Sequence, residues 1–271
     1  MIPEKTLQKQ ISLKKYIKDR KKAAVAFSGG VDSTFLLKIA HEELGDKVLA
    51  YTAVSAFFPT REQNEAKDWC RQEGIRQTIL SFSPLDLPKI AENPPDRCYH
   101  CKKELFHLMK KEAERTQVSY LMEGSNLDDL KDYRPGLRAI KELQILSPLK
   151  EIGFTKKEIR LLSKEMGLPT FDKPSFACLA SRFASGEPIT AKGLSMVEQA
   201  EELLFQKGFH QFRVRMHGNL ARIELLPEEL ETLVKKDCRE EITKKLQDYG
   251  FRYVTMDLMG YQTGSMNASF G

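Results

Sequence analysis

A strand, a loop of small residues and a helix follow one another near the start of the chain, and this order restricts the fold more than any other feature. Residues 22–27 (KAAVAF) form an apolar run typical of a buried strand, and residues 33–44 (STFLLKIAHEEL) carry apolar side chains at helical spacing. Gly29 and Gly30, in the loop between them, let backbone amides approach a ligand closely. Because the amino-terminal end of a helix favours negative charge, the stretch predicts an anion-binding loop.

The polar side chains of this loop point to a phosphate held together with a metal ion. Ser28 and Ser33 supply hydroxyl groups at the start of the helix. Asp32 would repel a phosphate unless a cation lay between them, so Mg²⁺ is implied. The loop lacks the Gly-Lys-Ser/Thr ending of the Walker pattern. From the residues alone, a glycine-rich turn without a ligand stays an alternative.

Segments typical of strands and of helices alternate through the first two-thirds of the chain. This alternation predicts an α/β fold, with a parallel twisted sheet covered by helices on both faces. Ligands of such sheets bind beyond the carboxyl ends of the strands. The expected strands are residues 22–27, 47–54, 75–82 and 118–124, and the expected helices are 33–44, 61–74, 101–117 and 155–167.

Two domains are expected, residues 1–187 and a smaller C-terminal α+β domain of residues 188–271. The regular alternation stops near this boundary. It is replaced by a helix, two strands around an HGN turn, a helical stretch and a last strand, at 193–208, 210–226, 227–250 and 251–261.

The composition is ordinary for a soluble globular enzyme. Of the 271 residues 41% are hydrophobic and 30% are charged, and no apolar run approaches the roughly 18 residues of a membrane span. The first 22 residues are too charged for a secretory signal, so we expect a cytoplasmic protein without a membrane partner. The net charge of +5 suits a nucleotide ligand but is too small to indicate nucleic acid.

Five cysteines, an odd number spread over the chain, do not form the framework of a secreted disulfide-rich protein. Cys98 and Cys101, at the start of a predicted helix, and Cys178, between the predicted domains, are candidates for sulfur chemistry or soft-metal binding. No second C-x-x-C completes a zinc site. A redox dithiol and a merely buried thiol stay open for these cysteines. We interpret Cys70 and Cys238 as small buried residues.

The loop and a second motif resemble the PP-loop, or N-type, ATP pyrophosphatases. SGGVDS after an apolar strand is similar to their pyrophosphate loop, and EGSNLDDLKDYRPG (123–136) is similar to their Gly-x-Asn-x-Asp-Asp segment. Without the resemblance, the two aspartates are equally compatible with a solvated turn. The resemblance implies an adenine nucleotide alpha hydrolase-like fold, with Mg²⁺ and ATP cleaved between its α and β phosphates. In it Ser28, Gly29, Gly30 and Ser33 would hold the pyrophosphate, Asp32 would help to hold Mg²⁺, and Gly124, Asn126, Asp128 and Asp129 would contact ATP or Mg²⁺.

Three further motifs extend the resemblance almost from end to end, to the LarE-type sulfur transferases within this group. They are KPSFACLASRF (173–183), FRVRMHGNLARIELL (212–226) and GYQTGSMN (260–267). The resemblance implies that the first domain uses ATP to adenylate a carboxylate of pyridinium-3,5-biscarboxylic acid mononucleotide and that sulfur then displaces AMP. Two rounds would give the bis-thiocarboxylate of the nickel-pincer cofactor.

Members of this family supply the sulfur in two ways. Some sacrifice the thiol of one cysteine at the position of Cys178, which becomes dehydroalanine. Others hold a 4Fe-4S cluster on three cysteines, and one open iron carries an extra sulfide. Cys98, Cys101 and Cys178 match the second pattern, so we expect the cluster rather than the sacrifice.

Arginines and a glutamate in the second half of the chain are the candidates for substrate binding. Arg213 and Arg215 alternate along FRVR and so share one face of a strand, where guanidinium groups suit phosphate and carboxylate. The resemblance implies that basic residues here and Glu224 line a site at a subunit contact. Arg182, four residues after Cys178, is a nearer candidate for the substrate or the AMP phosphate. A solvated Glu/Arg pair is the alternative for the strand residues.

The resemblance also implies partners and leaves rival functions open. It implies homo-oligomers, hexamers among them, and a carboxylase and a nickel insertase in the same cofactor pathway. A tRNA thiolase usually carries added zinc-binding or RNA-binding elements, and the sequence has no dense patch of basic and aromatic residues. An ammonia-using synthetase of the NAD or GMP type would not need the three cysteines, and an ATP sensor is the non-enzymatic alternative.

Overall fold

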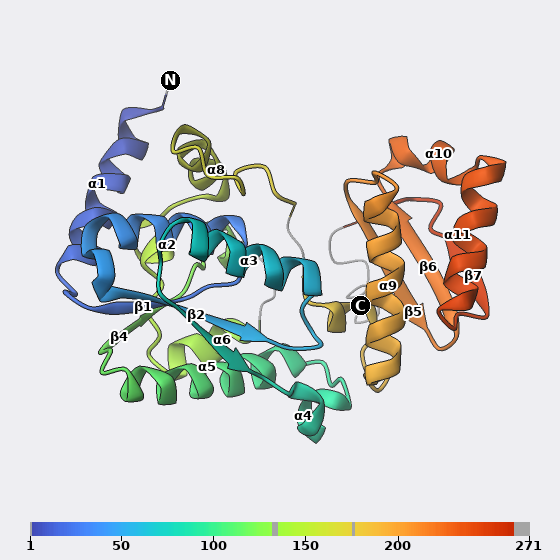
Figure 1. Ribbon diagram of the computed structural model, residues 1–271, viewed down its shortest axis with the longest axis horizontal. Coiled ribbons are helices and arrows are strands. Elements are labelled where there is room, and N and C mark those ends of the chain that lie inside the picture. Colours follow the sequence, from blue (N-terminus) through green and yellow to red (C-terminus); the bar gives the residue numbers. More distant parts are fainter. Residues whose placement is uncertain (1, 132–134, 175–176, 263–271) are drawn as a thin grey trace. The chain divides into compact units, whose positions relative to one another are not determined.

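The chain divides into two compact units that are interleaved in sequence. The computed structural model describes residues 2–131, 135–174 and 177–262. The first unit comprises Met1–Phe82 and Asp96–Phe176, and the second comprises Ser83–Pro95 and Ala177–Gly271 (Figure 1). Relative to the expected boundary at residue 188, the second unit also takes in residues 177–187 and a segment from the middle of the chain. Each unit is described separately below.

A four-stranded parallel sheet forms the centre of the first unit, in the order β3-β2-β1-β4. Ala23 of β1 pairs with Val48 of β2 on one side and with Tyr120 of β4 on the other. β2 and β3 therefore follow β1 on one side of the sheet, whereas β4 lies on its other side, so the strand order reverses between β1 and β4. The α/β fold is confirmed, with β1 at Ala23–Ala26, β2 at Val48–Val54, β3 at Gln77–Ser81 and β4 at Tyr120–Met122.

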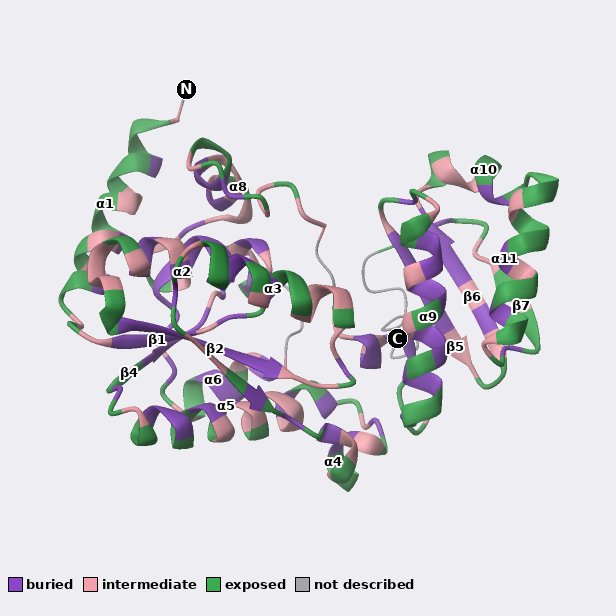
Figure 2. Ribbon diagram, in the orientation of Figure 1, coloured by how far each residue is buried: buried purple, intermediate pink, exposed green. Residues whose placement is uncertain are grey.

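Helices cover both faces of this sheet because its strands alternate apolar side chains between the two faces. Val25 packs with residues of α1, α2, α3 and α8, whereas Leu49 packs with residues of α5 and α6 on the opposite face. Figure 2 shows β1 and β2 as largely buried ribbons between these two layers. The helices are α1 (Glu4–Lys18), α2 (Val31–Leu44), α3 (Thr60–Gln72), α5 (Arg97–Arg115), α6 (Gly136–Glu142), α7 (Pro148–Ile152) and α8 (Lys156–Glu165).

The second unit contains a smaller mixed sheet in the order β5-β6-β7, in which β5 and β6 are antiparallel and β6 and β7 are parallel. This arrangement confirms the small C-terminal α+β fold. The middle segment joins this unit through Asn93, whose side-chain amide donates to the carbonyls of Ala184 at 2.7 Å and Glu187 at 3.1 Å. The elements are α4 (Pro88–Ala91), α9 (Ala191–Gln206), β5 (Phe212–His217), β6 (Leu220–Leu225), α10 (Leu230–Val234), α11 (Lys236–Asp248) and β7 (Tyr253–Met256).

A capping box marks the start of α8. Thr155 is the N-cap and accepts a hydrogen bond from the backbone amide of Glu158, and the Glu158 carboxylate accepts one from the Thr155 amide in return. No helix in the described part of the chain is long and apolar enough to cross a membrane.

Candidate functional site

The loop after β1 is shaped by a close contact with a neighbouring helix. Gly29 has a φ of 71°, and a Cβ atom there would lie 3.1 Å from the Cβ atom of Ala66 in α3. Both observations favour glycine. Gly30 is the N-cap of α2 and provides no side-chain capping bond, so the first-turn amides of α2 depend on another hydrogen-bond acceptor.

Two serine hydroxyls join the beginning and the end of this loop. The Oγ atom of Ser33 lies 3.2 Å from the Oγ atom of Ser28, accepts from the Ser28 amide at 3.4 Å and donates to the Gly30 carbonyl at 3.2 Å. The loop is therefore held in one shape by its own side chains.

The loop after β4 lies directly against the first turn of α2. A Cβ atom at Gly124 would come within 3.0 Å of the Ser33 amide nitrogen and within 3.3 Å of the Asp32 Cβ atom. Glycine is favoured here, because a Cβ atom would press on backbone that would have to move by a few tenths of an ångström. The structure thus brings together the two motifs that the sequence analysis quoted for nucleotide binding.

The polar side chains of the second motif bond mainly to local backbone. Asn126 accepts from the Asp128 amide, and Asp129 accepts from the Asn126 amide, each at 2.9 Å. Asp128 accepts from the amide of Lys156 at 2.8 Å and so joins this turn to the start of α8. These contacts shape the 3-10 turn at Leu127–Lys131. Residues 132–134 of the motif lie outside the described residues.

Asp32 has one paired oxygen and one buried oxygen without a partner. Its Oδ2 atom accepts from the Lys156 Nζ atom at 2.6 Å, whereas its Oδ1 atom is buried and has no hydrogen-bond partner within the described part of the protein. Burial raises the pKa of Asp32, Lys156 opposes this shift, and the charge of Asp129 adds to it. A buried carboxylate oxygen of this kind is a suitable ligand for a hard cation such as Mg²⁺.

Two lysines beside the loop were missed by the sequence analysis. Lys156 reaches Asp32, and the Nζ atom of Lys173 lies 2.8 Å from Glu65 and 3.3 Å from the Gly29 carbonyl. Arg160 of α8 holds the segment that carries Lys173, because its guanidinium donates to the Lys173 carbonyl at 2.7 Å. The only signals in the sequence were the N-cap before Lys156 and the KPSF motif, and neither shows which lysine faces the loop.

The candidate cysteines are distributed over both units. Cys98 is exposed and Cys101 half-buried in the first turn of α5, and Cys178 is half-buried in the second unit. No three His, Cys, Asp or Glu side chains among the described residues form a group that could hold a metal ion. Cys70 is buried, as expected, and burial raises the pKa of its thiol to about 12. Cys238 was also expected to be buried, but it is half-exposed near the start of α11.

The candidate substrate residues of the second unit form buried ion pairs with the protein. The Arg182 side chain is fully buried and makes a bidentate pair with Glu201, at 2.7 and 2.9 Å. Arg215 pairs with Glu224 at 3.0 Å, and Glu224 also accepts from Arg222 at 3.1 Å. The alternative of a Glu/Arg pair thus describes Arg215 and Glu224, although the pair is buried rather than solvated.

Arg213 lies opposite Glu224 in the β5–β6 ladder. It is buried, and burial together with the neighbouring charge of Arg182 lowers its pKa to about 10. Tyr261 lies near it, with the guanidinium carbon 5.1 Å from the ring centroid. The region of Arg213 is therefore rich in positive charge. The rest of the GYQTGSMN motif, from residue 263 onward, lies outside the described residues.

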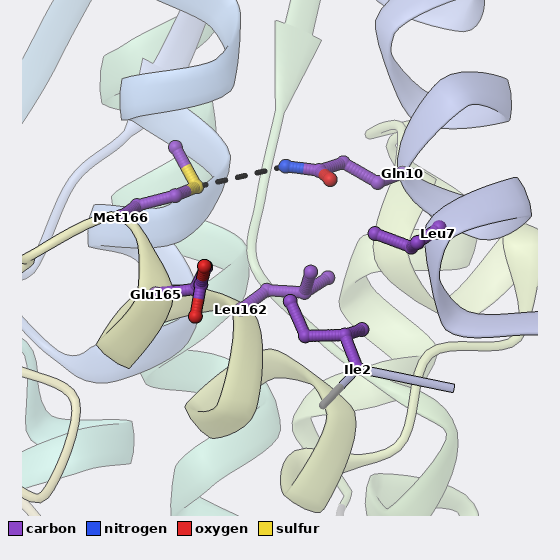
Figure 3. Close-up of a pocket in the computed structure, with 6 residues that line it drawn as sticks. All are labelled: Ile2, Leu7, Gln10, Leu162, Glu165 and Met166. Atoms are coloured by element: carbon purple, nitrogen blue, oxygen red, sulfur yellow. Dashed lines mark hydrogen bonds between the residues drawn. The ribbon is translucent and has the colours of Figure 1, made fainter. Parts of the chain in front are cut away.

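A separate hollow of about 520 Å³ lies between α1 and α8 of the first unit (Figure 3). The Gln10 amide reaches the Met166 sulfur at 3.7 Å across it. The described residues that line it are Ile2, Leu7, Gln10, Leu162, Glu165 and Met166. None of these is a cation that could bind a phosphate, and none is a candidate site residue.

Comparison with known proteins agrees with this geometry. No family model matches the chain. It is 26% identical over 168 residues to one of the subunits of the glutamine-hydrolysing GMP synthase of Thermoplasma volcanium, covering 56% of this chain and 54% of that protein. Fold and loop together define an adenine nucleotide alpha hydrolase-like protein, related to the ATP pyrophosphatase domain of GMP synthase.

Two further relatives match nearly the whole chain. An uncharacterized protein of Synechocystis is 41% identical over 256 residues, covering 94% of this chain and 96% of that protein. The pyridinium-3,5-bisthiocarboxylic acid mononucleotide synthase of Lactiplantibacillus plantarum is 36% identical over 261 residues, covering 96% of this chain and 94% of that enzyme. The chain belongs to the family of this synthase, the LarE-like family of ATP-dependent enzymes.

Proposed function

We propose that the protein is an ATP-dependent sulfur transferase that converts carboxylates of pyridinium-3,5-biscarboxylic acid mononucleotide into thiocarboxylates. The choice of substrate is supported by the similarity, over nearly the whole chain, to the Lactiplantibacillus synthase. The observation that carries the proposal is the loop at residues 28–33, with the buried and unpartnered oxygen of Asp32 beside the first turn of α2.

In the first step a substrate carboxylate oxygen attacks the α-phosphorus of ATP, and pyrophosphate leaves. The uncapped amides of α2 and the hydroxyls of Ser28 and Ser33 hold the departing pyrophosphate. The Nζ atom of Lys173 pairs with the half-exposed carboxylate of Glu65, and it would bind a phosphate oxygen in place of that carboxylate. Asp32 would hold Mg²⁺ through its Oδ1 atom, and that ion supplies charge neutralisation for the phosphates when bound.

In the second step sulfur forms a bond to the acyl carbon of the adenylate, and AMP leaves with the electron pair of the broken C–O bond. Cys178 contributes to this step either as the sulfur donor or as one of three ligands of a 4Fe-4S cluster. We favour the cluster because Cys98 and Cys101 accompany Cys178 in the sequence. The thiolates of Cys98, Cys101 and Cys178 would hold the cluster, which would supply the sulfide for this step.

The proposed adenylation is tested by pyrophosphate release from ATP and the biscarboxylate substrate, with thiocarboxylate formation followed by mass. Asp32→Asn should lower pyrophosphate release by about 100-fold or more. Asp68→Asn is the matched control, because Asp68 is exposed and pairs only at the surface with Arg71. Release that is unchanged in Asp32→Asn would contradict the role of the loop.

The cluster is tested separately, by iron and acid-labile sulfide per chain after anaerobic reconstitution. About four irons per chain, lost in each of Cys98→Ala, Cys101→Ala and Cys178→Ala, would support it. An iron-free protein that loses one sulfur from Cys178 per turnover would instead be a single-use donor. Full activity of a triple Cys→Ser chain with ammonia would favour the amide-forming chemistry of the GMP synthase relatives.

A further inference from the structure

The main chain around Cys178 is held by a fully buried arginine. The Arg182 Nη1 atom donates to the carbonyls of Ala177 at 3.0 Å and Cys178 at 3.3 Å. Ser181 adds two further bonds to the Cys178 carbonyl, from its amide at 2.9 Å and from its hydroxyl at 2.8 Å. Cys178 thus begins a tight 3-10 turn, Leu179–Arg182, whose preceding carbonyls converge on one guanidinium.

A buried glutamate of α9 holds that guanidinium in place. Glu201 binds the Nε and Nη2 atoms of Arg182, and one of its oxygens also accepts from the Val214 amide of β5 at 2.9 Å. Burial by itself would raise the pKa of Glu201. The charge and hydrogen bonds of Arg182 make the largest opposing contribution, and the pKa is lowered as a result. The carboxylate is therefore charged and connects helix, strand and cysteine turn.

A second ion pair fixes the other end of the same turn. The Nη1 atom of Arg215 donates to the Ser181 carbonyl at 2.9 Å, while its Nε atom is bound to Glu224 of the adjacent strand. The turn is consequently anchored from two directions, by α9 and by the β5–β6 hairpin.

We propose that Arg182 and Glu201 are positioning residues, which fix the Cys178 sulfur in the place required for sulfur transfer. The assignment rests on the proposed function, because that function gives Cys178 its part in the sulfur step. Arg182 has no exposed surface, and its donors already reach Glu201 and the turn. It therefore acts through the backbone of Cys178 rather than by binding the substrate or AMP.

The test replaces both members of the pair, since one alone would leave a buried charge unpaired. In Arg182→Met with Glu201→Gln, the glutamine still offers an oxygen to the Val214 amide. Iodoacetamide alkylation of the cluster-free protein is followed for Cys178 by peptide mass spectrometry, with exposed Cys98 as the internal reference. We expect alkylation of Cys178 to accelerate several-fold while that of Cys98 is unchanged.

Two activity measurements accompany the alkylation. Pyrophosphate release should stay within about twofold, and thiocarboxylate formation should fall by about 10- to 100-fold through kcat, with KM for the substrate unchanged. Arg182→Lys keeps the charge pair and should recover part of this loss. The matched control is Lys207→Met with Glu241→Gln, which removes a 2.6 Å ion pair of the same unit remote in sequence from the turn.

An unchanged Cys178 alkylation rate in the folded double variant would overturn the positioning role. So would a parallel fall of pyrophosphate release, since Arg182 would then serve the nucleotide. If the unaltered chain forms no thiocarboxylate, the proposed function fails, while faster alkylation in the double variant still supports the anchoring of the turn.

Discussion

Charged side chains are paired differently in the two units of this protein. In the first unit, Asp32 shares one oxygen with Lys156, and its other oxygen is buried without a hydrogen bond to the described residues. In the second unit, Arg182 and Glu201 satisfy each other through two short bonds. An incompletely satisfied buried charge indicates a place for a ligand, whereas a reciprocal buried pair indicates a structural anchor.

The solvent exposure of the cations supports the same distinction. Lys156 and Lys173 retain 29% and 16% of their side-chain exposure, so both can change partner when a phosphate arrives. The Arg182 side chain has no solvent exposure, and it is bound both to Glu201 and to the Ala177 carbonyl. The comparison therefore supports the ligand-binding role that we propose for the loop of the first unit and the positioning role that we propose for the pair in the second.

The largest effect on stability is expected from breaking the buried pair on one side only. Arg182→Met should cost about 3–5 kcal/mol of unfolding free energy, because Glu201 then remains buried without its bidentate partner. Adding Glu201→Gln should restore a substantial part of that loss. Urea unfolding of the single and double variants measures the difference, and equal losses would show that the charge of Glu201 tolerates the loss of Arg182.

A smaller effect is expected where the two loops of the first unit meet. Gly124→Ala should cost about 1–3 kcal/mol and lower pyrophosphate release, because its Cβ atom would press on the backbone of Ser33. Gly30→Ala is the control for stability, since its Cβ atom would make only an ordinary 3.5 Å contact with Ser28 Oγ. Thermal unfolding of both variants checks the prediction, which equal shifts in Tm would contradict.

Asp32→Asn should stabilise the protein in the absence of Mg²⁺ and ATP, by about 1 kcal/mol. Burial raises the pKa of Asp32, so as the pH rises the carboxyl group loses its proton in the unfolded chain before it does so in the folded protein. The free energy of unfolding therefore falls as the pH rises above the usual pKa near 3.8. The Tm advantage of the variant should therefore be larger at pH 7.5 than near pH 3.8. Millimolar Mg²⁺ should reduce it, and a variant less stable at every pH would contradict the assignment.

The smallest effect concerns an ordinary partly exposed ion pair of the first unit. Burial would raise the pKa of Glu158, but its bonds from Lys9 and Thr155 lower it. Its contribution is therefore present above pH 4.5 and is lost as the pH falls through the lowered pKa. Glu158→Gln should cost about 0.5 kcal/mol at pH 7 and nothing near pH 3, which urea unfolding measures beside the variant Glu240→Gln of an exposed residue.

Local features of the first unit were predictable because neighbouring residues determine them. The apolar run before Gly29 became β1, and Thr155 became the N-cap of α8 with Glu158 completing the capping box. The alternation of strands and helices likewise predicted the parallel sheet and its two helical layers. These features depend on spacing within about twenty residues, which a single sequence displays directly.

Pairing between distant residues was not predictable. Lys156 contacts Asp32 across 124 positions, and nothing distinguishes it in sequence from the adjacent Lys157. The sequence made Arg182 a candidate for the substrate or the AMP phosphate, but it gave no sign that Arg182 pairs with Glu201, which is one of several similar glutamates in its helix. Segment 83–95 likewise joins the second unit through contacts that no local pattern indicates.

The sequence by itself determined the α/β class, the loop of small residues at 28–33 that we propose to bind phosphate, and the set of candidate cysteines, because composition and short-range periodicity carry that information. The tertiary structure decided which charges are completed by protein and which are left for a ligand. That choice depends on burial and on partners brought together by packing, as Asp32 and Arg182 show with opposite results.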